Sequence, residues 1–515
     1  MQIIIPMSGV GQRFLDAGYK TPKPLIKVDG KTIIEHVCNL FPKESNYIFI
    51  CNKFHLRNTN MKKELLRLKP NSQIVAINPH KFGPVYAISK VFSLINDDDE
   101  TIVSYCDYGT KWNYFEFLKT VRNKKADGAI PSYTGFHPHM LGNNNYAFIK
   151  EKNKWLIKIK EKESFTKNKM NEFASNGTYY FKKGIYIKKY FQELLKKKIK
   201  VENEFYVSLV YNLLVKDKLK VLVYKIENML QWGTPFDLNE YIKWSNYFKK
   251  KNIKKNNYSL NKNTINLMLL AGRGLRYVRE GFKKPKPLIK INGKPMFIRA
   301  MKSLPISEQN FFVCKKKHIE KYYLKNIIKK HFPKSKIVSL NKHTQGQAST
   351  CEKGLYNQNI HKEVLIGTSD ADIIYNHKAY NKLLRNKKNQ IIVFCFKNSI
   401  SVMNKPNDYT FVKVDKNNYV KDVSEKKKIS NTPYKDHAIL GIFYFRKIKF
   451  FLEGMEEVYK RKHKINNEFY IDSIIKFLAK KKYKIKIFNV DHYIGWGTPN
   501  DLRVYYYWQK YFLNS

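Results

Sequence analysis

A short glycine-rich segment near the N-terminus combines residue types that bind phosphate groups. Gly9 and Gly11 form a Gly-x-Gly loop, Arg13 follows two residues later, and Lys23 stands between two prolines in the segment 22–24. Glycine lets backbone N–H groups approach an anion closely, and the arginine and the lysine neutralise its charge. The segment therefore predicts a site for the phosphates of a nucleotide or a similar anion.

The chain contains this segment twice. Gly272, Gly274, Arg276 and Lys286 repeat the glycines, the arginine and the proline-flanked lysine, each 263 residues after its counterpart, as from Arg13 to Arg276. A lone glycine-rich turn is common, but two copies with the same spacing of cations favour a functional role over isolated surface residues.

Two aspartates follow apolar runs at matching positions. Asp107 ends the run in TIVSYCDYG, and Asp370 ends the run in EVLIGTSDAD. A carboxylate at the C-terminal end of a parallel strand is where α/β sheets place ligand and metal sites. Each aspartate is thus a candidate metal ligand, with a helix N-cap as the alternative. Asp372 is an extra candidate in the second copy.

The elements that must position these residues follow from the apolar spacing. Short apolar runs at 3–5 and 267–270 lead into the glycine loops and predict buried strands. Apolar residues spaced as on one helix face follow within 33–41, and further strand-like runs lie at 47–51 and 311–314. Strands that alternate with helices predict a Rossmann-like α/β fold with a mainly parallel sheet flanked by helices.

The repeat extends along the whole chain. NPHKFGPVYAISK (78–90) aligns with NKHTQGQASTCEK (341–353), and NYAFIK (145–150) aligns with DYTFVK (408–413). One extra residue in the second copy then brings Glu161–Lys162 over Glu425–Lys426, NEFY (203–206) over NEFY (467–470), and QWGTP (231–235) over GWGTP (495–499). We therefore expect two tandem homologous domains, 1–250 and 264–515, joined by a lysine- and asparagine-rich linker at 251–263.

Composition excludes several classes of protein. The net charge is +55, but only 12 of the 97 basic residues are arginine and the lysines are spread along the chain, so specific nucleic-acid binding is not expected. No run approaches the roughly 18 apolar residues of a membrane span. The N-terminus lacks the basic region of a signal peptide, and the six cysteines are widely spaced. We expect a cytoplasmic protein with reduced thiols.

These motifs, in this order and twice over, resemble the sugar-phosphate nucleotidyltransferase superfamily, whose fold is GT-A-like and Rossmann-type. Within it the chain looks most like the capsule and surface-polysaccharide subgroup, which opens with an IPMAGxGxRF…AGY…PKPLI pattern and ends on a WGTPEDL-like segment. The matching segments here are IPMSGVGQRF…AGY…PKPLI and WGTPFDL or WGTPNDL. The resemblance covers nearly all of both halves.

The resemblance implies a role for each recurring residue. The loop with Gly9 and Gly11 would hold the triphosphate of an NTP, Arg13 and Lys23 would stabilise charge during catalysis, and Asp107 would bind Mg²⁺. Other binding positions are implied for Lys162 at the phosphate of the second substrate, Gly83 beside the base, and Gly177 beside the sugar-like substrate. In the second half the same roles fall to Gly272, Gly274, Arg276, Lys286, Asp370, Lys426, Gly346 and Gly441, with Gln345 and Gln347 offering donors and acceptors to a base edge.

The expected function is Mg²⁺-dependent nucleotidyl transfer from an NTP to a sugar-1-phosphate or a similar phosphorylated building block for capsule or lipopolysaccharide synthesis. One departure affects the metal: the family's second metal aspartate is replaced by Gln231 in one half and by Gly495 in the other. Differences between the copies, such as GVGQR against GRGLR, indicate different substrates or one degenerate half. The rival functions are a GT-A-type glycosyltransferase, for which Asp370-Ala371-Asp372 would be the metal motif, and a non-catalytic binding module. The sequence does not specify the base, the acceptor or the oligomeric state.

Overall fold

The computed structural model describes residues 1–250 and 261–513, which form two compact units. Unit 1 consists of Met1–Asn246 and the chain end from Tyr511, and unit 2 runs from Tyr247 to Lys510. Of the expected linker, 251–260 lie outside the described residues. Residues 261–263 belong to strand β15 (Asn261–Leu269), so the linker was predicted to end too late. These three residues are polar, so the sequence did not indicate that they begin a strand.

Unit 1 alternates strands and helices in its first part, as expected. Its helices are α1 (Gln12–Asp16), α2 (Ile33–Cys38), α3 (Lys53–Asn58), α4 (Met61–Leu68), α5 (Pro84–Ser89), α6 (Tyr114–Asn123), α7 (Gly184–Lys196) and α8 (Val207–Lys216), and α9 (Pro235–Lys250) begins in it. Its main strands are β1 (Gln2–Met7), β4 (Asn46–Asn52), β5 (Gln73–Ile77), β6 (Thr101–Ser104), β8 (Gly128–Tyr133), β9 (Ala147–Lys152), β10 (Trp155–Glu161), β11 (Phe173–Ser175), β12 (Thr178–Phe181) and β13 (Val221–Lys225). The short strands β2 (Lys27–Val28) and β3 (Lys31–Thr32) pair with each other, as do β7 (Tyr108–Lys111) and β14 (Asn228–Gln231).

The sheet of unit 1 is mixed rather than mainly parallel. Its strand order is β11-β9-β10-β13-β8-β12-β6-β1-β4-β5, in which β1 pairs in parallel with β4 and β6 and β4 pairs in parallel with β5. Beyond β6 the chain returns through β12, antiparallel to both β6 and β8, and through the hairpin of β9 and β10. The expectation of a mainly parallel sheet is wrong for this part because hairpin-linked strands need no crossover helix.

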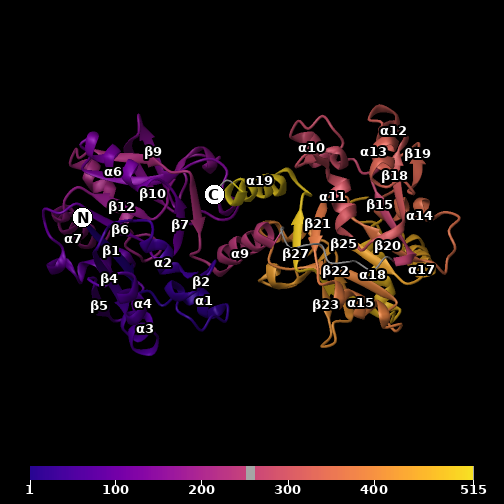
Figure 1. Ribbon diagram of the computed structural model, residues 1–515, viewed down its shortest axis with the longest axis horizontal. Coiled ribbons are helices and arrows are strands. Elements are labelled where there is room, and N and C mark those ends of the chain that lie inside the picture. Colours follow the sequence, from indigo (N-terminus) through magenta and orange to yellow (C-terminus); the bar gives the residue numbers. More distant parts are fainter. Residues whose placement is uncertain (251–260, 514–515) are drawn as a thin grey trace. The chain divides into compact units, whose positions relative to one another are not determined.

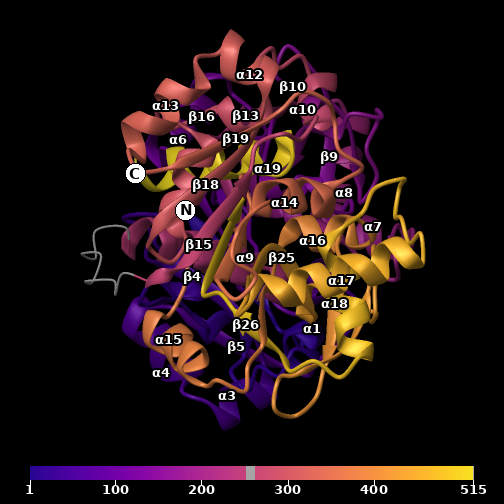
Figure 2. The same ribbon diagram turned by 90° about the vertical axis from the view of Figure 1, so that its right-hand side faces the viewer.

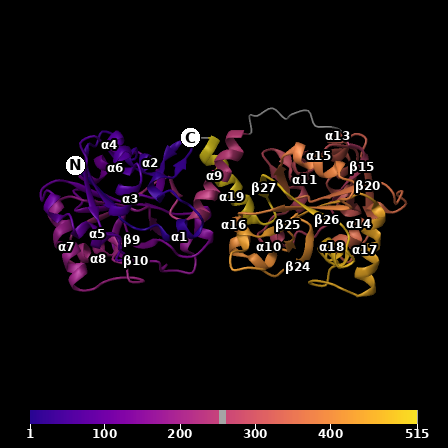
Figure 3. The same cartoon turned by 90° about the horizontal axis from the view of Figure 1, so that it is seen from below.

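Both faces of this sheet are buried. Ile3 and Ile5 belong to one apolar cluster and Ile4 to another, which follows from the alternation of side chains along a strand. Helices cover these faces; Figure 1 shows α3 and α4 beside β4 and β5, and Figure 3 shows α7 next to α8. The predicted helix at 33–41 is observed as α2, whose N-cap Thr32 accepts a hydrogen bond from the Glu35 amide at 3.2 Å.

Unit 2 repeats this element order. Its helices are α10 (Leu275–Arg279), α11 (Met296–Ser303), α12 (Lys316–Lys321), α13 (Leu324–His331), α14 (Gln347–Leu355), α15 (His377–Arg385), α16 (Ile400–Asn404), α17 (Ile448–Lys460) and α18 (Ile471–Lys480), and α19 (Pro499–Leu513) begins in it. Its strands are β15, β16 (Lys290–Ile291), β17 (Lys294–Pro295), β18 (Ser307–Lys315), β19 (Lys336–Leu340), β20 (Glu363–Gly367), β21 (Ala371–Ile374), β22 (Ile391–Phe396), β23 (Phe411–Val414), β24 (Val420–Ser424), β25 (His437–Phe445), β26 (Ile485–Asn489) and β27 (His492–Gly495). The sheet order β19-β18-β15-β20-β25-β22-β26 matches β5-β4-β1-β6-β12-β8-β13 of unit 1.

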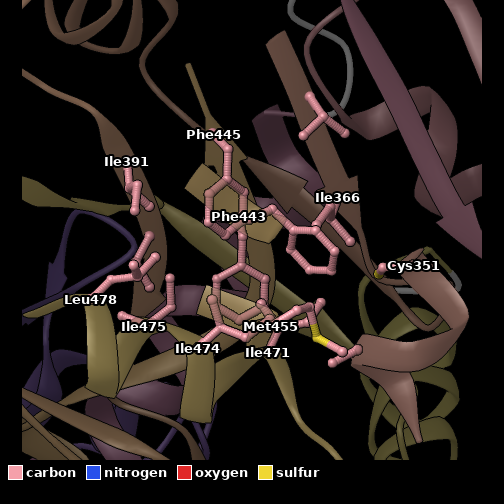
Figure 4. Packing of buried hydrophobic residues seen from close by; sticks show 14 of the residues in the cluster. Cys351, Ile366, Ile391, Phe443, Phe445, Met455, Ile471, Ile474, Ile475 and Leu478 are labelled. Carbon is pink, nitrogen blue, oxygen red and sulfur yellow. The ribbon is translucent and has the colours of Figure 1, made fainter. Parts of the chain in front are cut away.

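The largest core cluster of unit 2 lies between β25 and two helices. Phe443 and Phe445 of β25 pack near Ile474 and Leu478 of α18 and Met455 of α17 (Figure 4). Figure 2 shows α17 and α18 running side by side, in agreement with their direct contact. Among the described residues no helix is both long and apolar enough to cross a membrane.

Candidate active site

The glycine loop of unit 1 connects β1 to α1. Gly11 is the N-cap of α1 and has φ = 73°, a left-handed conformation that favours glycine. Its carbonyl accepts a hydrogen bond from the Phe14 amide at 2.9 Å. The sequence therefore places a tight turn at the carboxyl end of a buried strand, where backbone amides can face a ligand.

Lys23 and Asp107 form an ion pair at the centre of the site. Lys23 begins a 3-10 turn, Asp107 follows β6, and Lys23 Nζ lies 2.7 Å from Asp107 Oδ2. Burial alone would lower the pKa of Lys23, but the Asp107 carboxylate outweighs this effect and the pKa is raised. Lys23 is therefore charged at neutral pH. The structure thus brings together two predicted residues that lie far apart in the sequence.

Two cavities meet at this ion pair. The first, of about 580 Å³, is lined by Gly9, Gly11 and Gly83 among others. The second, of about 390 Å³, is lined by Arg13, Lys162, Gly177 and Gln231 among others. Both cavities share five lining residues that matter here: Gly11, Lys23, Asp107, Glu204 and Tyr206. All the predicted site residues of unit 1 thus lie along one continuous path.

Gly83 packs against the backbone of Phe205, whose neighbours Glu204 and Tyr206 line both cavities. Gly83 has φ = 84° and precedes α5, and a Cβ atom at this position would lie 2.8 Å from both the amide nitrogen and the carbonyl oxygen of Phe205. The Phe205 amide donates to the Phe82 carbonyl at 2.9 Å, and the Val85 amide donates to the Phe205 carbonyl at 3.2 Å. The need for glycine here comes from this close backbone approach.

Glu204 was not among the residues predicted for the site. Glu204 lies in the loop before α8 and lines both cavities, and Glu468 lines the cavity of unit 2. The recurrence of NEFY was the signal that could have revealed this position. His80, whose Nε2 lies 3.1 Å from Ser8 Oγ, also lines the first cavity and was not among the predicted residues.

The second cavity holds the predicted acceptor-side residues. Lys162, with φ = 59°, forms an ion pair with Glu202, and its ammonium group lies 5.3 Å from the centre of the Tyr206 ring. The carbonyl of Gly177, with φ = 95°, accepts a hydrogen bond from the Tyr105 amide at 2.9 Å. This side of the site therefore offers a cation and an aromatic wall to a small ligand.

Glu161 beside Lys162 has an unusual environment for a carboxylate. It accepts a hydrogen bond from Ser208 Oγ at 2.5 Å. Burial raises the pKa of Glu161 to about 7, despite the opposing effect of this hydrogen bond. Near neutral pH the side chain is therefore divided between its protonated and ionised forms.

The late Trp-Gly-Thr-Pro segment lies against Asp107. A Cβ atom at Gly233 would lie 2.8 Å from Asp107 Oδ2, and Gln231 pairs with Tyr108 across β14 and β7. Gln231, which stands where the family has a second metal aspartate, is thus adjacent to Asp107 and carries an amide in place of a carboxylate. Trp232 is fully buried.

Unit 2 builds the same centre. Gly274 is the left-handed N-cap of α10, with φ = 63°, and Lys286 forms an ion pair with Asp370. Burial opposes ionisation of Asp370, but Lys286 outweighs it and the pKa of Asp370 is lowered. A cavity of about 580 Å³ is lined by Gly272, Gln345, Gly346, Gln347 and Asp370 among others.

Five predicted residues of unit 2 do not line this cavity: Gly274, Arg276, Lys286, Lys426 and Gly441. Arg276 NH2 lies 3.2 Å from Asp408 Oδ2, and Lys426 Nζ donates to the Asp408 carbonyl at 2.6 Å. By contrast, the side chain of Arg13 in unit 1 has no hydrogen bond or ion pair within residues 1–250 and 261–513. The cavity also contains Arg273 at the position of Val10 in unit 1.

Asp372 forms an ion pair with Arg299 and not with the Lys286 that binds Asp370. Arg299 NH2 lies 3.1 Å from Asp372 Oδ2, and the Arg299 guanidinium stacks 5.1 Å from the centre of the Trp496 ring. Asp372 does not line the cavity and is bound to Arg299, which disfavours Asp370-Ala371-Asp372 as a paired metal motif. In the described part of the chain, no three or more His, Cys, Asp or Glu side chains cluster as a metal site.

Comparison with known proteins agrees with this geometry for the first half of the chain. Residues 2–228 match the family described as nucleotidyl transferase. A curated relative, the bifunctional protein GlmU of Buchnera aphidicola, is 29% identical over 213 residues, which cover 40% of this chain and 42% of the relative. These findings support the nucleotidyltransferase superfamily. The chain spans less than half the length of that relative.

Two solved structures of pyrophosphorylases are similar to about half of this chain. A nucleoside-diphosphate-sugar pyrophosphorylase from Vibrio cholerae RC9 is 19% identical, with a TM-score of 0.40, and 47% of this chain covers 99% of it. A UDP-glucose pyrophosphorylase from Acinetobacter baumannii is 16% identical, with a TM-score of 0.36, and 49% of this chain covers 94% of it.

Proposed function

We propose that unit 1 transfers a nucleotidyl group from an NTP to the phosphate of a small building block such as a sugar-1-phosphate, with release of pyrophosphate. The observation that carries this proposal is the position of the Lys23–Asp107 ion pair, which lies where the glycine-loop cavity meets the cavity with Lys162. A transfer reaction needs two substrates to meet at one point, and these two cavities provide that point.

The chemistry requires charge neutralisation more than covalent catalysis. An oxygen of the acceptor phosphate attacks the α-phosphorus of the NTP, and the bond between the α-phosphorus and the bridging oxygen breaks as pyrophosphate leaves. Both reactants are anions, so their approach is unfavourable until cations offset the charge. We assign this role to Arg13 and Lys23, with Lys162 holding the acceptor phosphate and the loop of Gly9 and Gly11 holding the triphosphate.

Asp107 would hold Mg²⁺ in this proposal. Mg²⁺ binds proteins through one or two carboxylates together with substrate phosphates and water, and it supplies charge neutralisation at those phosphates. Asp107 fits because Lys23 contacts Oδ2 and no residue in the described parts of the chain bonds Oδ1. Asp370 fits less well, since Thr368 and Lys286 bond its two oxygens.

We further propose that the chain is a tandem duplication whose units handle different substrates. The equal strand order of the two sheets and the repeated ion pair support this proposal. The subgroup resemblance extends it to cytoplasmic synthesis of a capsule or lipopolysaccharide precursor. A glycosyltransferase is the weaker candidate, because Asp372 is bound to Arg299 instead of facing the cavity beside Asp370.

The test is pyrophosphate release from each NTP in Mg²⁺ with a panel of sugar-1-phosphates and other phosphate monoesters. Wild type is compared with the Asp107→Asn and Asp370→Asn variants. Release that depends on the acceptor and is lost in Asp107→Asn supports the proposal. No release with any pair, together with transfer from a nucleotide sugar, refutes it. Loss of one and the same activity in both variants rules out separate substrates.

A further inference from the structure

One residue of unit 2, Asp408, contacts two cations at once, Arg276 and Lys426. Asp408 ends a 3-10 turn over Pro406–Asp408, and it binds Arg276 through its carboxylate and Lys426 through its backbone carbonyl. Arg276 corresponds to Arg13, and Lys426 corresponds to Lys162. Asp408 therefore bridges the positions where the nucleotide and the acceptor phosphate would meet.

Unit 1 has a neutral residue at the same position. Asn145 aligns with Asp408 and lines the second cavity, next to Arg13 and Lys162. The Arg13 side chain remains without a hydrogen bond or ion pair in the described parts of the chain, and Lys162 pairs with Glu202. Glu202 in turn is replaced by Asn466 in unit 2. Unit 1 thus leaves its arginine for a ligand, whereas unit 2 satisfies both cations from within.

We propose that Asp408 excludes phosphate monoesters from unit 2, so that unit 1 alone accepts the phosphorylated building block and unit 2 binds a nucleotide without transferring it to phosphate. This inference rests on the proposed function of unit 1. A carboxylate about 5 Å from a phosphate dianion weakens its binding about ten-fold even in a water-like dielectric. The bridging position of Asp408 adds a steric obstacle to this repulsion.

The nucleotide side of unit 2 shows no such exclusion. Arg273 lines the cavity, and Lys315 Nζ, at the position of Asn52 in unit 1, lies 3.0 Å from His343 Nε2. Both substitutions add positive charge beside the glycine loop, where the phosphates of an NTP would lie. Unit 2 therefore keeps positive charge for the phosphates of an NTP beside its glycine loop.

The experiment exchanges the two residues in the full chain and measures binding of inorganic phosphate by isothermal titration calorimetry. Asp408→Asn should add a second phosphate site or tighten phosphate binding at least ten-fold, and Asn145→Asp should weaken the existing site about ten-fold. Matched controls are Glu456→Gln on α17 and Asn123→Asp on α6, which make the same charge changes at exposed positions. The controls should leave phosphate binding unchanged, and all four variants should keep the wild-type affinity for an NTP.

Phosphate binding by Asp408→Asn equal to that of wild type would overturn the inference. If Asp408→Asn fails to fold, Asn145→Asp decides, because unchanged phosphate binding there also refutes it. The titration needs no turnover, so its result stands apart from the proposed function. Pyrophosphate release is measured separately for Asn145→Asp in an Asp370→Asn background. In that background, Asn145→Asp should raise the KM of the acceptor about ten-fold and leave the KM of the NTP unchanged. If the Asp370→Asn protein without the Asn145→Asp change releases no pyrophosphate, the proposed function is refuted but the inference about Asp408 is not.

Discussion

The two aligned glutamates Glu161 and Glu425 should respond to pH in opposite ways. Glu161 receives one hydrogen bond, from Ser208, and burial raises its pKa to about 7. Glu425 is also desolvated, but Lys476 and Ser473 outweigh this effect and its pKa is lowered. Asn212 occupies the position of Lys476 in unit 1, so a single substitution accounts for much of the difference.

The magnitude follows from the size of the shift. An acid with a raised pKa contributes stability that is fully present below its unfolded pKa and is lost as the pH rises through its folded pKa. The pKa of Glu161 moves from 4.5 to about 7. At 1.36 kcal/mol per pKa unit, ionisation of Glu161 costs unit 1 up to about 3 kcal/mol between pH 4.5 and 8. Glu161→Gln should therefore stabilise unit 1 by about that amount at pH 8 and change little at pH 4.5.

Glu425→Gln is the control with the opposite sign. A depressed pKa contributes stability that is present above the unfolded pKa and is lost as the pH falls through the folded value. Loss of the charged hydrogen bonds to Lys476 and Ser473 should cost unit 2 about 2 kcal/mol at pH 8, and the difference from wild type should shrink in acid.

Urea unfolding of the full chain at pH 5 and pH 8 measures both effects. Hydrogen–deuterium exchange of peptides from α8 and α18 assigns them to unit 1 and unit 2. A difference between Glu161→Gln and wild type that does not vary with pH would refute the reasoning, as would a shared direction of pH dependence for the two variants.

Three further changes test the site. Gly83→Ala should destabilise unit 1 by about 3 kcal/mol or more, because its positive φ is strained for alanine and the Cβ atom would meet the Phe205 backbone. Thermal unfolding measures this effect. The control Gly9→Ala, with nothing within 4 Å of its Cβ position, should shift the unfolding midpoint little. Lys23→Met should lower the rate of pyrophosphate release about 100-fold or more. The control Lys27→Met, at an exposed position, should leave this rate unchanged. Equal rates for the two variants would exclude Lys23 from catalysis. Asp372→Asn should cost unit 2 about 3 kcal/mol in urea unfolding, because it breaks the partly buried pair with Arg299. Nucleotide affinity, measured by equilibrium dialysis, should stay intact. A loss of this affinity would make Asp372 a candidate metal ligand again.

The sequence predicted the residues of the centre better than their contacts. Gly11, Lys23 and Asp107 were found because each recurs at a constant spacing in the second half. That Lys23 bonds Asp107 could not be predicted, because these residues belong to elements that only the folded sheet brings together. The strand–loop–helix order around the glycine loop was predictable because a short, uniformly apolar run leads directly into the glycines.

Other features left weaker signals. The mixed half of the sheet in unit 1 contains strands as short as β11, with three residues, which carry too little periodicity to show their direction. Asp408 lies in an exposed turn, where no hydrophobic pattern indicates which side chains face the site. Glu204 precedes an apolar helix, and the sequence does not show that left-handed residues such as Asn203 come just before it.

The backbone contact between Gly83 and Phe205 has a consequence for how two ligands would bind. Phe205 is held by hydrogen bonds to Phe82 and Val85 on the nucleotide side, and its neighbours Glu204 and Tyr206 line both cavities. A ligand that displaces Glu204 or Tyr206 in one cavity therefore alters the lining of the other. Occupancy of either cavity should then change the affinity of the other, and thermodynamic reciprocity requires the same factor in both directions.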